Sequence, residues 1–141
     1  MAHEQNSHGL TPLLDVCTHW NSTYVMLEQA LVCQEAYTGM LASTHYHLLL
    51  LTEGEWKRLA VLVQLLKGFK EYTNFAQAGI SWATIGNTIL IYNAIMEVLE
   101  KFMFIKTSNG KNVLDPKKKA EMPDLMMGAV AAYRKLRMYY S

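Results

Sequence analysis

Two stretches of this 141-residue sequence place largely apolar side chains every three or four positions, the spacing of one face of an α-helix. The first stretch comprises Trp56, Leu59, Leu62, Val63, Leu66, Phe69 and Thr73. The second comprises Ile85, Ile89, Tyr92, Met96, Leu99 and Met103, widened by Leu90, Ile91, Ile95 and Val98. A face of this width favours the core of a helical bundle over a two-stranded zipper.

Capping signals precede two of the predicted helices. Thr52 to Glu55 has the T-x-x-E form, in which the hydroxyl and the carboxylate satisfy backbone N–H groups, so a helix is predicted from there to about Phe75. Upstream, the side-chain oxygens of Asn21 to Thr23 can cap another helix. Its apolar positions run from Tyr24 to Met40, and Gly39 is expected to end or weaken it.

The last part of the chain contains a turn signal and the start of a final helix. Ser108 to Gly110 predicts a turn, which leads into a polar connection containing three lysines and reaching about Glu121. Pro123 suits the first turn of a final helix, because proline lacks only an N–H group that is unbonded there. The expected buried stripe of this helix is Leu125, Ala129, Ala132 or Tyr133, Leu136 and Tyr140.

The predicted fold is all-α, an irregular bundle of about four main helices. Leu10 to Val16 contains a proline, which favours an extended segment and suits an edge strand. Ala42 to Leu51 fits either a turn followed by a short helix or an extended stretch. Because the length allows one compact core, we expect a polar leader over residues 1–10 and a single helical domain over residues 11–141.

Composition gives no direct pointer to a partner. Thirteen Lys and Arg balance twelve Asp and Glu, whereas nucleic-acid-binding domains usually show a strong basic excess. No apolar run approaches the roughly 20 residues that cross a bilayer, and the polar amino terminus offers no secretion signal. We therefore expect an intracellular protein of the nucleus or cytoplasm, without membrane contact, with Cys17 and Cys33 as free thiols.

The sequence offers few side chains that could come together to form a catalytic or metal-binding site. His45 and His47, even with Cys17, His19 and Cys33, match no standard zinc spacing, so no metal or other cofactor is expected. The carboxylates are scattered, which favours no catalytic residue. Trp20 beside His19 could stack a base at a helix entrance, but packing of Trp20 into the core is the favoured interpretation of the bare sequence.

Three blocks of the sequence resemble part of a hAT superfamily DNA transposase. They are LLDVCTHWNSTYVMLEQAL, EWKRLAVLVQLLKGFKEYTNFAQAGISWATIGNTILIYNAIMEVLE and AVAAYRKLRMYYS. The resemblance spans about Leu13 to Tyr140, and its first block is the most specific. It implies the end of the upstream part of an RNase H-like domain plus the helical insertion, without the acidic triad, the zinc-finger domain or the dimerisation segment.

The resemblance also bears on individual residues. Asp15 lies beside the Trp motif and is not expected to be catalytic, and His19 stands where the family usually has Arg, which removes a permanent charge. The expected function is protein–protein contact without catalysis, including self-association or interference with a full-length relative. One alternative is weak DNA binding through Trp20, His19, Lys117, Lys118, Lys119, Arg134 and Arg137. The other is a small-molecule or enzymatic role through a core pocket.

Overall fold

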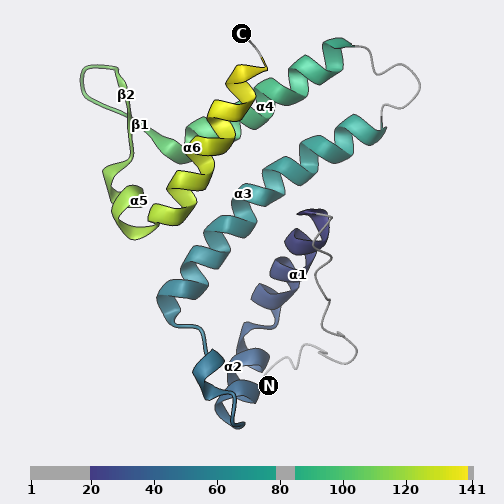
Figure 1. Cartoon of the computed structure of the whole chain (residues 1–141), viewed down its shortest axis with the longest axis vertical. Helices are drawn as coiled ribbons and strands as arrows, with labels where there is room; N and C mark the ends of the chain where they lie inside the picture. Colours follow the sequence, from purple (N-terminus) through teal and green to yellow (C-terminus); the bar gives the residue numbers. More distant parts are fainter. Residues whose placement is uncertain (1–19, 79–84, 140–141) are drawn as a thin grey trace, which may run out of the picture. The chain divides into compact units, whose positions relative to one another are not determined.

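A computed structural model describes residues 20–78 and 85–139 of the chain. Contacts within the chain divide it into two compact units, Met1–Leu59 and Ala60–Ser141, which are described separately below. Helix α3, Glu53–Ala78, runs through the division (Figure 1). The single domain expected over residues 11–141 stays a prediction.

The first unit contains two successive helices, α1 (Trp20–Val32) and α2 (Gln34–Ala42). The sequence predicted one helix here, and the structure interrupts it at Cys33, where φ is −97° and ψ is 18°. Helical hydrogen bonds continue on both sides, since Cys33 N–H donates to Gln29 O at 3.0 Å and Tyr37 N–H donates to Cys33 O at 2.9 Å. The interruption is a local break and not a loop.

Of the two alternatives for Gly39, that it ends or that it weakens the first helical region, the first is wrong, because Gly39 lies inside α2. An added Cβ at this glycine would have nothing within 4 Å, so neither space nor backbone conformation requires a helix end there. The segment left open by the sequence is a turn followed by a short 3₁₀ helix, η1 (His47–Leu49). At Leu50 the chain becomes extended before α3 begins.

Helix α3 begins with the capping box that the sequence predicted. Thr52 N–H donates to Glu55 Oε2 at 2.7 Å, and Glu55 N–H donates to Thr52 Oγ1 at 3.2 Å. The Thr52 hydroxyl also donates to Glu55 Oε2, at 2.9 Å. The Thr52 N–H and then the Thr52 hydroxyl lower the pKa of the Glu55 carboxyl, because they stabilise its charged form. The helix continues beyond the predicted end at Phe75 to Ala78.

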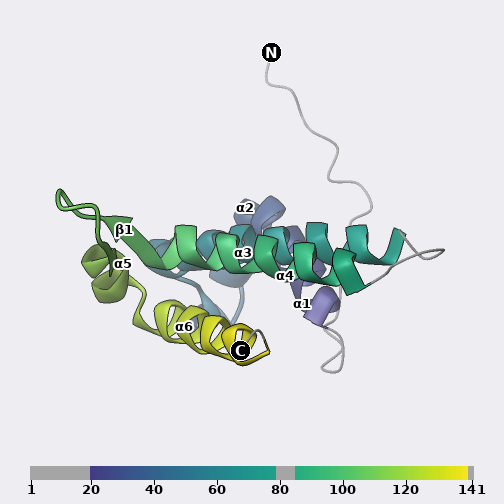
Figure 2. The ribbon, with the colours of Figure 1, turned by 90° about the horizontal axis from the view of Figure 1, so that it is seen from above.

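The core of the second unit lies between α4 (Ile85–Met103) and α6 (Pro123–Met138), which pack side by side (Figures 1 and 2). Leu99 is 1% exposed and Met103 is fully buried. The other buried members of this cluster are Phe102, Met126 and Ala129. Partly buried side chains of α3, α4 and α6 surround it, including Val61, Leu65, Phe69, Ile95, Leu125, Ala132, Tyr133 and Leu136.

The sequence predicted most of this core, including Leu99, Met103 and the stripe of α6. It missed two buried members of the cluster, Phe102 and Met126, as well as the partly buried Val61 and Leu65 of α3, which pack against it. It also extended the buried face of α4 to Ile89, which is 44% exposed in the structure. Tyr140, expected at the end of the stripe, lies outside the described residues. Within this unit, burial on α4 is concentrated toward its carboxyl end.

A two-stranded hairpin, absent from the sequence prediction, follows α4 directly. Strand β1 (Phe104–Lys106) pairs antiparallel with β2 (Asn112–Leu114), and Ile105 lies opposite Val113. Its turn needs glycine, because Gly110 has a φ of +72°. Asp115 N–H donates to Met103 O at 2.8 Å, which ties the base of the hairpin to the end of α4.

The prediction of a polar loop after the turn is also partly wrong. Residues from Pro116 to Glu121 form a short helix, α5, and not a loop, although the final helix starts at Pro123 as predicted. The fold is mostly helical, which confirms the predicted class. No described helix is long and apolar enough to cross a membrane. The extended segment expected at Leu10 to Val16 lies outside the described residues.

A hydrogen bond joins α4 to α6 beside the core. Tyr133 Oη donates to Glu100 Oε1 at 2.6 Å, and the Tyr133 ring meets Phe104 edge to face with centroids 6.1 Å apart. The pKa of the Tyr133 phenol is raised, because this bond to Glu100 and then burial both favour the protonated form. The bond therefore requires the neutral phenol.

We expect Tyr133→Phe to reduce the alkaline sensitivity of the fold. Since the folded-state pKa lies above the unfolded value of about 10, this tyrosine contributes stability below pH ~10, which is lost as the pH rises through the folded pKa. The unfolding free energy, measured by urea titration at several pH values, should fall more steeply above pH ~10 in the parent protein than in Tyr133→Phe. Tyr46→Phe in the first unit is the control, and equal slopes for all three proteins would contradict the assignment.

Candidate functional site

The residues expected to contact DNA fall in both units. His19 lies outside the described residues, and Trp20 is the first residue of α1, with its side chain also outside the description. The lysines of residues 117–119 lie on α5, and Arg134 and Arg137 lie on α6. The structure therefore describes the side chains of only the part of this set that belongs to the second unit.

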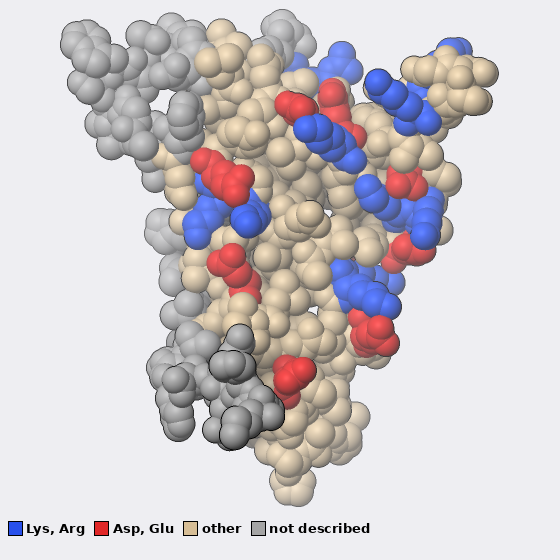
Figure 3. Space-filling view, turned by 180° about the vertical axis from the view of Figure 1, so that it is seen from behind, with Lys and Arg blue, Asp and Glu red and all other residues tan. Residues whose placement is uncertain are grey.

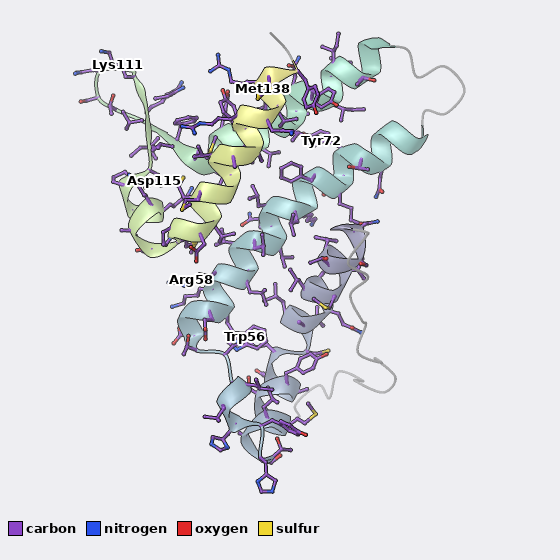
Figure 4. The ribbon with its side chains drawn as sticks, viewed as in Figure 1. Trp56, Arg58, Tyr72, Lys111, Asp115 and Met138 are labelled. Atoms are coloured by element: carbon purple, nitrogen blue, oxygen red, sulfur yellow. The ribbon has the colours of Figure 1, made fainter. Side chains whose placement is uncertain are left out.

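Asp115 explains why the lysine run forms a helix. Its Oδ1 accepts hydrogen bonds from the backbone N–H of Lys117 at 3.0 Å and of Lys118 at 3.3 Å. Pro116 occupies the first turn, where the N–H group that proline lacks would have no partner within the helix. Aspartate is a preferred residue at this capping position. Figure 4 shows Asp115 at the base of the hairpin and Lys111 at its tip.

Lys118 is a structural residue and not an open phosphate site. Its Nζ donates to Phe102 O at 2.9 Å, so it satisfies a carbonyl in the last turn of α4 that has no helical partner. The same atom lies 5.0 Å from the centre of the Phe102 ring and 3.9 Å from Asp115 Oδ2. By contrast, among the described residues neither Lys117 nor Lys119 forms an ion pair, and both are exposed.

The basic residues of α5 and those of α6 do not form one cluster. Lys117 lies in α5, which precedes the amino end of α6, whereas Arg134 lies eleven positions after Pro123, about 16 Å along the helix axis (Figure 1). Arg137 lies over the Tyr133 ring, with its Cζ 6.0 Å from the ring centre. The site expected from the sequence is thus split between the two ends of α6.

The candidate metal ligands are dispersed. His45 and His47 are exposed near η1, and Cys33 is half-buried at the junction of α1 and α2. Cys17 and His19 lie outside the described residues. Within residues 20–78 and 85–139, no three His, Cys, Asp or Glu side chains are grouped so that they could hold a metal ion.

Although the total charge is near zero, basic and acidic residues are distributed unequally between the two units. Unit Ala60–Ser141 carries eleven Lys and Arg against six Asp and Glu, whereas Met1–Leu59 carries two against six. Residues 101–141 alone hold nine basic and three acidic side chains. Figure 3 shows basic side chains over the hairpin and α5, with carboxylates between them. Charge counted in windows along the sequence would have shown this asymmetry.

An uncharged apolar surface was also missed. It comprises Met40, Tyr46, Leu48, Leu49 and Leu51 of the first unit and is called the leucine surface below. Leu48 is 86% exposed and Leu49 is 64% exposed. Between Glu35 and Glu53 the sequence contains no Asp, Glu, Lys or Arg, so the segment that contributes most of this surface carries no fixed charge. The run of four leucines was the available signal, but its exposure depends on tertiary structure.

A small groove lies beside the leucine surface, within the same unit. Its volume is about 190 Å³, and it is lined by side chains of α1, α2, η1 and the first turn of α3. Leu49, Leu51 and Trp56 contribute to its walls. Trp56 is 9% exposed and points from the start of α3 toward the side of the unit that carries α2 (Figure 4). The groove is apolar and has room for one or two aliphatic side chains.

A family comparison supports the resemblance over the first part of the chain. Residues 2–65 match the family model of the ZBED1 RNase-like helical domain, a region derived from hAT transposases. The match includes the Trp20 motif, α1, α2 and the start of α3. For the residues that follow, the transposase resemblance stays a prediction.

A search of curated proteins gave a distant relative. The chain is 33% identical over 92 residues to tpeD of Talaromyces stipitatus, named as a candidate transcriptional regulator. The aligned region covers 65% of this chain but 11% of that protein, so the chain corresponds to a small part of its relative. No solved structure matches the chain.

We expect Lys118→Met to destabilise the second unit, because the substitution keeps the aliphatic stem and removes the ammonium that bonds Phe102 O. The loss should be about 1 kcal/mol in urea unfolding, since the bond is charge-assisted but partly exposed. Lys117→Met and Lys119→Met, at neighbouring exposed positions, should change stability by less than about 0.5 kcal/mol. Equal effects at all three positions would show that Lys118 is an ordinary surface lysine.

Proposed function

We propose that this chain is a non-catalytic, hAT-transposase-derived helical protein that acts through protein–protein contact, including contact between its own copies. The family match over residues 2–65 supports the derivation. The sequence resemblance places the chain outside the acidic triad, so the proposal assigns it no catalytic residue.

The observation that carries the proposal is the leucine surface. Burying an apolar side chain such as that of Leu48 removes it from water, and fully burying one leucine stabilises a complex by about 1.5–3 kcal/mol. Cores of protein interfaces are depleted of charged residues, and the segment between Glu35 and Glu53 has this property. Contiguous exposed apolar patches commonly mark interaction sites.

The neighbouring groove suits a second copy of the chain. An exposed leucine and an apolar groove on one unit are the two halves of a self-complementary contact, in which each copy inserts the same residue into its partner. Leu48 projects from this unit, and the groove volume of about 190 Å³ accommodates its side chain. A contact of this kind closes as a symmetric dimer.

We expect the chain to self-associate and the double substitution Leu48→Asp/Leu49→Asp to weaken association. Two carboxylates would have to be buried without partners, so the dissociation constant measured by sedimentation equilibrium should rise about tenfold or more. Met127→Asp in the second unit is the matched control, because Met127 is 71% exposed and lies outside the leucine surface. A monomer mass independent of concentration would contradict self-association.

Nucleic-acid binding is a second candidate function, favoured by the basic excess of the second unit. Lys111 at the hairpin tip and Lys117 and Lys119 on α5 are exposed. Phosphate contacts by such side chains bind without sequence preference and release counterions. Trp20 remains a candidate for base stacking in this proposal. Lys118 is not counted, because its ammonium bonds the α4 carbonyl.

We expect binding to single-stranded and hairpin DNA to be measurable at low salt and to weaken as salt rises. Each phosphate contact to a single strand contributes about −0.7 to the slope of log affinity against log salt. Lys117→Gln/Lys119→Gln should make this slope shallower by roughly 1.4 in fluorescence anisotropy titrations. Lys57→Gln/Arg58→Gln, which removes equal charge from the first unit, should change it less. Flat titrations of the parent protein at low salt would reject this function.

A further inference from the structure

A second groove, separate from the leucine surface, lies within unit Ala60–Ser141. Its volume is about 500 Å³, and it is formed by α3 and α4 with Lys118 of α5 at its edge. Ligand-binding clefts commonly have volumes of about 300–1,000 Å³. We call it the lysine-rimmed groove, because its charged lining residues are Lys67, Lys101, Lys118 and Glu71.

The floor of the lysine-rimmed groove is apolar and well packed. Val61 and Leu65 of α3 line it and also pack against the core cluster, to which the buried Phe102 belongs. At one point the two helices come very close, because a Cβ added to Gly68 would lie 3.2 Å from Cγ atoms of Val98. These contacts fix the floor, so an apolar ligand would meet a preformed surface.

The rim carries more positive than negative charge. Lys67 is exposed and, within the described residues, forms no ion pair. Lys101 pairs with Glu97 at 2.6 Å, but both side chains are mostly exposed, and such surface pairs contribute little. Lys118 is held by Phe102 O, and Glu71 supplies the one carboxylate of the lining. Lys67 and Lys101 therefore remain able to turn toward an anion.

We propose that the lysine-rimmed groove binds an amphipathic anion, a small molecule with an apolar body and one carboxylate, sulfonate or phosphate group. Its apolar body would cover Val61 and Leu65, and its anionic group would pair with Lys67 and Lys101. A neutral apolar molecule would form no ion pair with Lys67 or Lys101. A small inorganic anion would not cover the apolar side chains of the floor, which would stay exposed to water. Charge complementarity together with the apolar floor therefore defines the ligand class.

The proposal is tested with two fluorescent probes, the anionic 1-anilinonaphthalene-8-sulfonate and the uncharged N-phenyl-1-naphthylamine. Both are titrated into the Leu48→Asp/Leu49→Asp protein, which removes the leucine surface as a competing apolar site. In that background Lys67→Gln/Lys101→Gln should raise the Kd of the anionic probe about tenfold and leave that of the uncharged probe within about twofold. Lys117→Gln/Lys119→Gln removes the same charge outside the groove and should leave both values unchanged.

A blocking substitution tests the location. Gln64 lines the groove and is exposed, so Gln64→Trp should fill the groove without disturbing the core, and both probes should then bind at least about tenfold more weakly. Circular dichroism and urea unfolding establish that each variant is folded. Unchanged binding of the anionic probe to Lys67→Gln/Lys101→Gln, or of both probes to Gln64→Trp, would overturn the proposal. Because these probes do not report self-association, the outcome is independent of the proposed protein contact.

Discussion

Burial of the last turn of α4 is the constraint on which the second unit depends. Leu99 and Met103 are almost completely removed from water, and they are covered by Met126 and Ala129 of α6. The chain must therefore return from the end of α4 to place α6 against it. The hairpin and α5 make that return, and Asp115 and Lys118 anchor it to backbone carbonyls of Met103 and Phe102. A polar network thus holds the connection to an apolar core.

The same anchoring separates two kinds of lysine within one short run. Lys118 is needed to complete the end of α4, whereas its neighbours on α5 are solvated. The basic character of residues 101–141 therefore cannot be translated directly into a ligand site. Only those lysines whose ammonium groups have no internal role remain for phosphate or carboxylate partners.

Sequence periodicity predicted the elements whose apolar faces are long, including α3, α4 and α6. It missed the hairpin because each strand has three residues, too few for alternation to show, although the turn at Gly110 was recognised. It took the lysine run for a loop, because Asp115 followed by Pro116 is typical of turns as well as of helix starts. Of the candidate site, the sequence placed Lys117 before the final helix and Arg134 within it, as the structure does. Their separation in space could not be predicted, since tertiary packing decides which charges become neighbours.

The order of elements in the second unit bears on how this unit folds. Its most extensive packing, between α4 and α6, spans only the hairpin and α5, and the Glu100–Tyr133 bond joins residues 33 positions apart. Contacts over short sequence separations close small loops and cost little chain entropy. Domains of this type form their native contacts quickly, in microseconds to milliseconds for helical proteins of low contact order. Because the hairpin and α5 form the whole connection between α4 and α6, the loop that must close before these two helices pack is short.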